Sequence, residues 1–423
     1  MKLKRYAVEY VKYRHNGEEV DLPRYKFKES DIRGVWISNV ANIDTPRGVS
    51  KEEYQKHLIG ILDNMKSYNM NTAIFQVRPT NDAYYPSKLN PWSRFITGTE
   101  DGDPGFDVLK FFIDEANKRG IRVHAWMNPY RVSGTDITTV NMTKEEFLNT
   151  LSERNWARLH PEHTILDGTH KVLLSPSHKE VIDFVTASIM EVAENYDVDA
   201  VHIDDYFYPY AKISEDDERE DYLKYRLDEN QSFDDFRRMN VDKMIKNIHD
   251  ELKKLFSKKG KKVEFGISPF AIYRTHSSIV EGGWDKGSYN SAGALQCYSE
   301  LYSDVYKWME EGWIDYVVPQ DYFSFDRKDV SYHDIVWWWN ERCKETKTKL
   351  YIGQGLYMCG VKEGFSKYAW QNPKEMENQL RLNCAFDQIK GTIFFTYRDL
   401  VPSDNKIKNK NLESIKKLWN NKK

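Results

Sequence analysis

Eight short apolar segments recur along the chain, and between them lie stretches whose apolar residues have the spacing of amphipathic helices. The segments that we predict to be strands are 33–40, 72–79, 122–130, 199–207, 264–271, 314–323, 350–357 and 391–397. Strands that alternate with helices favour a parallel sheet with right-handed crossovers. Eight such units predict an α/β fold of the closed (β/α)8 kind, the TIM barrel.

Helix signals support this division of the chain. Ser50 with Glu53 three residues later predicts a capping box at the start of a helix over 50–70. The stretch 106–120 ends in a basic turn and Gly120, as a helix C-terminus does. An open doubly wound sheet is the alternative fold, but no glycine-rich phosphate loop follows the first predicted strand.

The predicted loops are unequal in length, which indicates where a site would be built. Those after the second, third and fourth strands (80–106, 131–178 and 208–235) are long and polar. Loops at the strand exits carry the active sites of TIM barrels. We expect residues 1–30 to be a short N-terminal extension and residues 31–423 to form one catalytic barrel.

Composition narrows the function classes. The 62 basic and 65 acidic residues nearly balance, so no overall field favours a nucleic acid or an anionic membrane as partner. No apolar run is long enough to span a membrane. The first twenty residues lack the apolar core of a signal peptide, so the sequence as given predicts a cytoplasmic protein, or an envelope or secreted one if a leader was removed. The four cysteines lack metal-ligand spacing, and we expect no cofactor.

The segment DAVHIDDYFYPY, residues 199–210, carries the strongest chemical signal. A short apolar strand ends there in Asp204 and Asp205, followed by four aromatic residues. Carboxylates at the end of a buried strand are costly unless they are paired, hydrated or used. Period-two alternation predicts that His202 and Asp204 face the barrel axis. Aromatic rings beside acids are typical of a carbohydrate site.

Glycosidic bond hydrolysis needs one carboxyl to protonate the leaving oxygen and another to attack the sugar or activate water. Asp204 is the candidate nucleophile or base, and Asp205 would orient it, bind substrate or exchange roles with it. Asp321, at the end of the sixth predicted strand, is the candidate acid, with Glu300 in reserve. Each of these also fits a structural role, because an acidic residue after a strand is often a helix cap.

Polar and aromatic side chains at the other strand exits are candidates for substrate binding, with packing or ion pairing as the alternative for each. They are Gln76, Arg78, Trp126, Asn128, Tyr130, Arg131, His202, Tyr206, Tyr208, Gln320, Tyr322 and Tyr397.

Two other functions remain open at this level. His124, His202, Asp204 and Asp205 together could hold a divalent metal in a polysaccharide deacetylase, although barrel metal sites usually need more histidines, so we expect no metal. A glycan-binding barrel without catalysis would keep the aromatic residues and lose the acid pair. A serine nucleophile is disfavoured because no GxSxG motif occurs.

Six blocks of the chain resemble the bacterial glycosyl-hydrolase-like family ten, from about Asp31 to the eighth predicted strand. They are RGVWISNV, the long block from FQVRPTNDAYYP to GFDVL, RVHAWMNPYRVS, DAVHIDDYFYPY, FGISPFAIYR and EGWIDYVVPQDYF. The resemblance implies a (β/α)8-barrel hydrolase of glycan strands, acting on peptidoglycan or a related bacterial polysaccharide.

A weaker likeness concerns mechanism. DAVHID is similar to the fourth-strand block of α-amylase-type barrels, which places their nucleophile at Asp204, whereas α-galactosidase-type barrels pair acids that match Asp204 and Asp321. The chain departs from the pattern of the family that it resembles at PQDYF, where we would expect a non-acidic residue in place of Asp321. It also lacks the secretion signal expected of an envelope enzyme.

Overall fold

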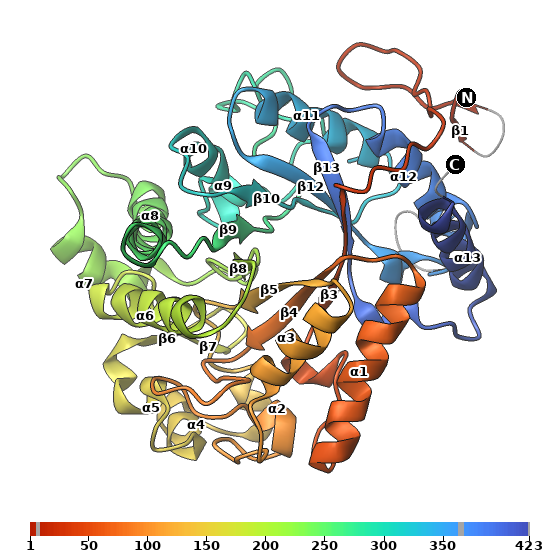
Figure 1. The fold of residues 1–423 in the computed structure, drawn as a ribbon. Coiled ribbons are helices and arrows are strands. Elements are labelled where there is room, and N and C mark those ends of the chain that lie inside the picture. The colour runs from red at the N-terminus through yellow and green to blue at the C-terminus, as the bar shows by residue number, and fades with distance from the viewer. Residues whose placement is uncertain (6–8, 363–367, 422–423) are drawn as a thin grey trace.

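The computed structural model describes residues 1–5, 9–362 and 368–421, and within them eight strand positions form one closed parallel barrel (Figure 1). Val35 of the first strand pairs with Phe394 of the last, which closes the ring. The sixth position is split around Pro319 into two short strands, both of which pair with the seventh. The strands are β3 (Ile32–Ile37), β4 (Thr72–Arg78), β5 (Arg122–Met127), β8 (Ala200–Ile203), β9 (Glu264–Ile267), β10 (Tyr316–Val317) with β11 (Gln320–Asp321), β12 (Lys349–Gln354) and β13 (Ile389–Phe394). The predicted (β/α)8 fold is confirmed.

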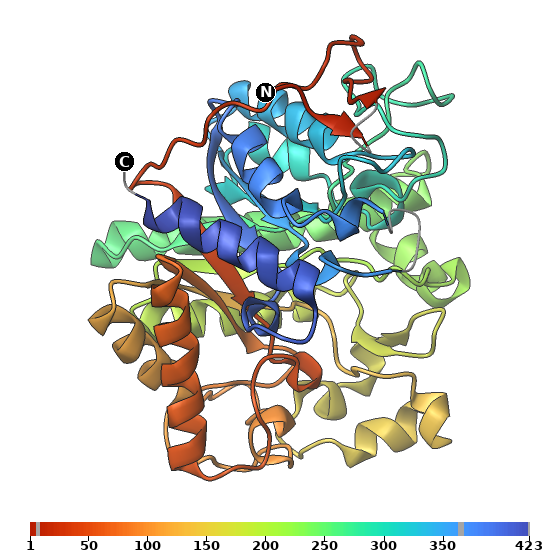
Figure 2. The same ribbon diagram turned by 90° about the vertical axis from the view of Figure 1, so that its right-hand side faces the viewer.

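Helices surround the barrel on the outside, one or more after each strand (Figures 1 and 2). The capping box of Ser50 and Glu53 is present at the start of the first of them, as predicted. In Figure 2 the last helix lies beside the first, and Asn69 Nδ2 donates to the Trp419 carbonyl across 2.7 Å. The outer helices are α1 (Lys51–Ser67), α3 (Val108–Lys118), α6 (Lys179–Asn195), α8 (Phe233–Lys259), α10 (Val305–Glu310), α11 (Tyr332–Lys344), α12 (Glu375–Asn383) and α13 (Lys406–Asn420).

Two hydrophobic layers fix which way each strand faces. In β8, Ala200 belongs to the small cluster inside the barrel, whereas Val201 and Ile203 belong to the larger core between strands and helices. The alternation predicted for this strand is therefore confirmed. Gly266 of β9 also faces inward, where a Cβ atom would lie 1.8 Å from the ring of Tyr316, so only glycine leaves room for that ring.

The long loops after the strands contain short elements of their own. The segment between β5 and α6 is the richest, and Arg131 at its start forms a β-bridge to Leu173 near its end. The short elements of the loops are η1 (Val40–Asn42), α2 (Arg94–Thr97), η2 (Ile137–Val140), α4 (Lys144–Thr150), α5 (Trp156–Leu159), η3 (Pro161–His163), β6 (Thr164–Leu166), β7 (Val172–Leu174), α7 (Glu215–Tyr225), α9 (Cys297–Glu300), η4 (Leu356–Met358), η5 (Ala369–Gln371) and η6 (Tyr397–Leu400).

The N-terminal extension carries the two-stranded sheet of β1 (Lys4–Arg5) and β2 (Glu9–Tyr10) and packs on α11. The ring of His15 stacks on Trp337 at 3.7 Å, and the Arg14 N–H donates to Asp334 Oδ1 across 3.0 Å. These two contacts attach the extension to the first turns of α11.

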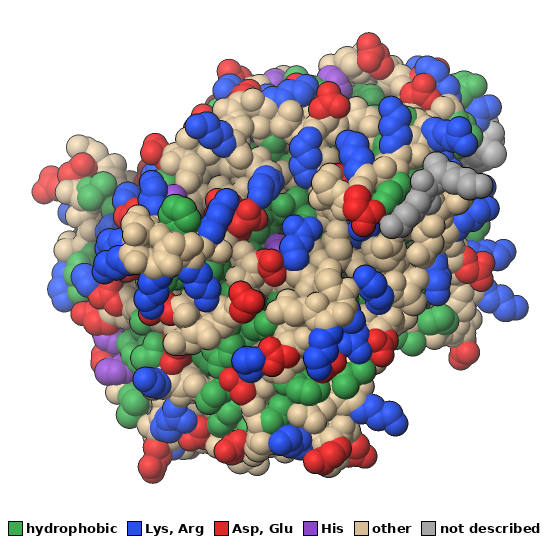
Figure 3. Space-filling model, in the orientation of Figure 1, with side chains coloured by type: hydrophobic (Ala, Val, Ile, Leu, Met, Phe, Trp, Pro, Cys, Tyr) green, Lys and Arg blue, Asp and Glu red, His purple; other side chains and the backbone are tan. Residues whose placement is uncertain are grey.

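The molecular surface carries both signs of charge. In Figure 3, lysine, arginine and acidic side chains are intermingled over the face shown, in line with the balanced composition. Among the described residues, none of the helices combines the length and the apolar character that a bilayer crossing requires.

Candidate active site

Asp204 lies one residue beyond β8, at the carboxyl end of the barrel, and N–H groups surround its carboxylate. Trp126 Nε1 donates to Oδ2 across 3.0 Å, and Asn128 Nδ2 donates to Oδ1 across 3.1 Å. The backbone N–H of Tyr206 also donates to Oδ1 across 3.1 Å. Three N–H groups from two strand ends therefore fix the orientation of the Asp204 carboxylate.

Strand register explains why these groups meet. Trp126 of β5 is the ladder partner of His202 in β8, so the indole and Asp204 project from adjacent strands on the same side. Asn128 follows β5 by one residue, and its Oδ1 accepts the Arg131 N–H across 2.8 Å. The asparagine therefore links Asp204 to the start of the long loop.

Asp205 has a different environment from its neighbour. Tyr210 donates its hydroxyl proton to Asp205 Oδ2, and Gln320 provides a further side-chain hydrogen bond. Burial and then the adjacent charge of Asp204 raise the pKa of Asp205 to about 6, while these two donors lower it. A carboxyl group with this pKa keeps its proton at pH values where an ordinary aspartate has lost it.

Aromatic rings gather around the two acids. The ring of Tyr322 stacks on Phe395 with centroids 5.6 Å apart, and Tyr357 meets Tyr322 edge-on at 5.8 Å. The Arg131 guanidinium lies 4.6 Å from the Tyr206 centroid, and the charges of both aspartates reach Tyr206. Partly exposed rings of this kind offer flat apolar surface to a sugar.

Below the acids, polar side chains fill the barrel interior. His202 Nε2 lies 2.9 Å from Ser268 Oγ, and its Nδ1 lies 3.0 Å from the Tyr316 hydroxyl. Gln320 Nε2 donates to the Ser268 carbonyl across 2.8 Å. Burial lowers the pKa of His202 well below its ordinary value, so this ring is neutral. His202 therefore supports the floor of the site from within the barrel.

Asp321 does not meet Asp204. It pairs in register with Gln354, and side chains at paired positions of a parallel ladder point to the same side. Gln354 bonds Gln379 of α12, so Asp321 also points into the layer between strands and helices, where Tyr332 and Asp334 are its charged or ionisable neighbours. Burial raises the pKa of Asp321 well above the ordinary value, and the backbone N–H of Phe323 lowers it only in part.

Glu300, the reserve acid, has a backbone partner of its own. It ends the short helix α9, where its Oε2 accepts the backbone N–H of Gln296 across 2.7 Å. Its nearest charged groups are Lys212 and Asp234, and burial raises its pKa. The backbone bond makes Glu300 a brace for its own turn.

Five of the expected substrate-binding residues are occupied within the fold. Arg78 is buried and donates to the carbonyls of Asn128 and Pro129. Gln76 accepts the N–H groups of Asn39 and Val40 through Oε1. The remaining three side chains are buried tyrosines with no exposed ring face, namely Tyr130, Tyr208 and Tyr397. These residues shape the loops behind the site and have no surface for a sugar.

Tyr210, Tyr357 and Phe395 are residues of this region that were not among the site residues expected from the sequence. Tyr210 is 47% exposed and holds Asp205, and Phe395 supports the ring of Tyr322. Tyr210 stands in the same aromatic run as Tyr206, so the run itself was the available signal. Phe395 follows the inward-facing Ile393 by two positions, so strand alternation would have found it.

The alternative metal set is not assembled at the barrel end. In the described chain, none of the groups of three or more potential ligands includes His124, His202, Asp204 or Asp205. His124 instead places its Nδ1 2.8 Å from the Tyr316 hydroxyl, deep in the barrel. This arrangement differs from the one that a metal-dependent deacetylase would need.

Comparison with known proteins decides the family. The model of the family described as glycosyl hydrolase-like 10 matches residues 31–370. The chain belongs to this family. The glycosyl hydrolase YngK of Bacillus subtilis is 37% identical over 375 residues, covering 88% of this chain and 69% of its own. The glycosyl hydrolase DigH of Escherichia coli K12 is 36% identical over 377 residues, which cover 86% of this chain and 82% of DigH. The resemblance noted in the sequence is confirmed, and the protein is a glycoside hydrolase.

Solved structures agree on the fold. An α-L-fucosidase isoenzyme from Paenibacillus thiaminolyticus has a TM-score of 0.52 at 12% identity, covering 93% of this chain and 49% of its own. The PgaB glycoside hydrolase domain from Bordetella bronchiseptica has a TM-score of 0.51 at 11% identity. This match covers 93% of the present chain and 99% of the PgaB domain. At such identity the likeness concerns the barrel alone.

Proposed function

We propose that the protein hydrolyses glycosidic bonds of a bacterial polysaccharide, the glycan strands of peptidoglycan in the first instance, using Asp204 and Asp205 as its catalytic pair. One observation carries the proposal: two adjacent carboxyl groups at the carboxyl end of the barrel have different hydrogen-bond partners, and partly exposed aromatic rings lie beside them. Membership in the glycosyl hydrolase-like 10 family supports the reaction class.

The chemistry follows from the difference between the two groups. Asp205, protonated below about pH 6, donates its proton to the glycosidic oxygen as the bond from C1 to that oxygen breaks. Asp204, as a carboxylate, either attacks C1 or takes a proton from the water that does so. In either case one water is consumed and each new chain end carries a hydroxyl group.

The neighbours of the pair have distinct duties in this scheme. Trp126 and Asn128 fix the orientation of Asp204 through their N–H groups. Tyr210 and Gln320 hold Asp205 and limit the rise of its pKa. The rings of Tyr206 and Tyr322 provide surface for the sugar. Two environments that push a pair of carboxyl groups toward different protonation states are the usual basis for acid and base assignments.

The sharpest experiment is turnover of purified peptidoglycan, and of a panel of chromogenic glycosides, by wild type and single variants. We expect release of reducing ends by wild type, a loss of about 10²–10⁴-fold in Asp204→Asn and Asp205→Asn, and retained binding. Asp321→Asn is the matched control, because it makes the same chemical change away from the pair. Equal turnover by all four proteins would reject the catalytic pair.

The same assay separates the rival functions. A glycan-binding barrel would bind peptidoglycan without releasing reducing ends, in wild type and variants alike. A deacetylase would release acetate and leave the glycan length unchanged. Either pattern would rule out the proposed hydrolysis. If the enzyme does hydrolyse the glycan, the anomer of the product that NMR detects first distinguishes retention from inversion of configuration.

A further inference from the structure

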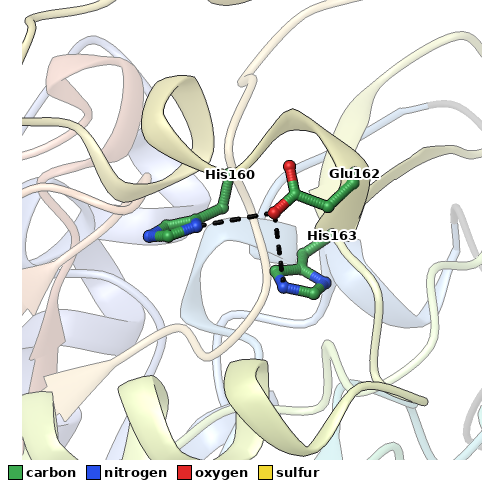
Figure 4. Close-up of side chains that lie close together, drawn as sticks. All are labelled: His160, Glu162 and His163. Atoms are coloured by element: carbon green, nitrogen blue, oxygen red, sulfur yellow. Dashed lines mark ion pairs between the residues drawn. The ribbon is translucent and has the colours of Figure 1, made fainter.

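A cluster of metal-ligand side chains lies away from the acid pair, in the long loop between β5 and α6. Figure 4 shows His160, Glu162 and His163 on a single turn around η3, with Glu162 between the two rings. Glu162 Oε1 lies 3.5 Å from His160 Nδ1 and 3.6 Å from His163 Nε2. One ligand atom from each of the three lies within 4.8 Å of the others.

These separations suit a tetrahedral ion. With Zn–N and Zn–O bonds of about 2.0–2.2 Å, donor atoms around tetrahedral zinc lie about 3.4 Å apart. The two printed distances to Glu162 are close to that value, so the side chains need only small rotations to share one ion. Two imidazoles and a carboxylate are also a ligand set that zinc takes, with a fourth position left for water.

The fold holds the rings in place and leaves their nitrogens available. Trp156 lies 4.5 Å from His160 and stacks on His163 at 5.5 Å, ring centroid to ring centroid. Neither ring nitrogen of His163 makes a hydrogen bond within the described chain, and its Nδ1 is buried.

We propose that His160, Glu162 and His163 bind one divalent transition metal ion, with zinc as the favoured ion. Imidazole ligands favour zinc over magnesium or calcium. The site opens on a pocket of about 710 Å³ whose lining includes His160, His163, Trp156 and Phe184. The ion would cross-link the turn at η3 and order this part of the long loop.

A second triad shares one member and defines the competing placement. His163, His178 and Glu180 also bring one ligand atom each within 4.8 Å of the others. His178 Nε2, however, lies 3.0 Å from Asp221 Oδ2, so this nitrogen is already engaged. Glu180 is exposed at the start of α6. Glu162 and Glu180 therefore form a matched pair of carboxylates that can be tested separately.

The experiment is calorimetric titration of the full chain, treated with chelator, with Zn²⁺ at pH 7.5 and with Mg²⁺ in parallel. We expect one zinc ion per chain and no measurable magnesium binding. His160→Gln and Glu162→Gln should weaken zinc binding at least about tenfold, and His163→Gln at least about a hundredfold, since losses of this order follow even from changes beside metal ligands. Glu180→Gln should change the affinity less than about twofold.

The control for histidine content is His170→Asn, an exposed histidine of the same loop with a positive φ of 54° that asparagine tolerates. It should bind zinc as wild type does. Circular dichroism of each variant without metal checks the fold. If His163→Gln fails to fold, zinc binding by Glu162→Gln tests the site, because Glu162 is exposed and its replacement should leave the fold intact. The assignment would be overturned if wild type bound no zinc or if every variant bound zinc equally. It would also be overturned if Glu180→Gln lost zinc binding and Glu162→Gln kept it. The zinc titration uses variants of the loop around η3, whereas the test of glycan hydrolysis uses variants of Asp204 and Asp205. Either proposal can therefore fail without the other.

Discussion

The indole N–H of Trp126 donates to Asp204 Oδ2 across 3.0 Å, and this bond joins the third barrel strand to the end of the fourth. The same carboxylate accepts two further N–H groups, whereas Asp205 next to it is held by a hydroxyl group and an amide. Two adjacent aspartates are thereby placed in unlike electrostatic surroundings. The reactivity of the site should depend on that difference.

The first prediction concerns Asp204. Asp204→Asn keeps the shape of the side chain but removes the negative charge that the three N–H groups surround. The amide cannot attack C1 or accept a proton from water, so kcat should fall about 10²–10⁴-fold. Steady-state release of reducing ends from peptidoglycan measures the effect.

Asp321→Asn is the comparison. Burial raises the pKa of Asp321 well above its ordinary value, which favours the protonated form, and an amide resembles that form in shape and charge. We expect kcat within about threefold of wild type, because a side chain that does not touch the reacting atoms contributes little to the barrier. A loss in Asp321→Asn as large as that in Asp204→Asn would return Asp321 to the role of acid.

The second prediction concerns pH. If Asp205 is the acid, activity should fall as the pH rises through its pKa of about 6, because the proton donor is lost. The Tyr210 hydroxyl group stabilises the charged form of Asp205 and so lowers this pKa. Tyr210→Phe removes that donor, and the basic limb of the kcat/KM profile should move to higher pH.

Tyr206→Phe provides the control for this shift, since it removes a hydroxyl group from the same aromatic run while keeping the backbone N–H that Asp204 accepts. Its basic limb should coincide with that of wild type. A limb that moves to lower pH in Tyr210→Phe, or does not move, would contradict the acid role of Asp205.

The third prediction concerns substrate binding. Tyr322 is partly exposed, and its ring is held by Phe395 and Tyr357. Tyr322→Leu removes a flat surface at the site, and ring contacts are worth about 0.5–1.5 kcal/mol, so KM should rise about two- to tenfold with a smaller change in kcat. Tyr322→Phe keeps the ring and should retain the KM of wild type. An equal rise in both variants would assign the effect to the hydroxyl group instead.

The sequence predicted the barrel well because its signals are local and repeated. Apolar runs and helix caps located all eight strands and the helix that begins after Ser50. Alternation also oriented β8 correctly, since Val201 and Ile203 differ clearly in polarity from His202. Wherever a strand has a clear alternation, the inward residues can be read from the sequence.

The sixth strand lacks that signal. Tyr316, Val317 and Val318 are all apolar, and Pro319 then interrupts the ladder, so the sequence does not reveal which side Asp321 faces. Loop residues were harder still. Tyr208 and Tyr206 stand two positions apart, yet Tyr208 is buried and donates to Glu218 while Tyr206 stays partly exposed. Tertiary packing decides the direction of such side chains, and no local period records it.

The last prediction concerns stability. Glu375 opens α12 and is 2% exposed, and burial raises its pKa to about 8 from an ordinary value of 4.5. Between pH 4.5 and 8 the unfolded chain ionises this carboxyl group while the folded chain keeps its proton. The unfolded state then binds fewer protons, so the free energy of unfolding falls as the pH rises across this window. At about 1.36 kcal/mol per pKa unit the loss is on the order of 4–5 kcal/mol.

Glu375→Gln should remove this loss, because the amide cannot ionise and its carbonyl oxygen can still accept the Phe325 N–H, which reaches Glu375 Oε1 across 3.3 Å. Urea unfolding at pH 5 and pH 8 measures the difference. Glu377→Gln is the control on the same helix, where the carboxylate pairs with Arg381 at 2.7 Å and is partly exposed. Its free energy of unfolding should fall with pH as steeply as that of wild type. If the free energy of unfolding of Glu375→Gln also falls as steeply with pH, the buried carboxyl group is already ionised at neutral pH, and its pKa is lower than about 8.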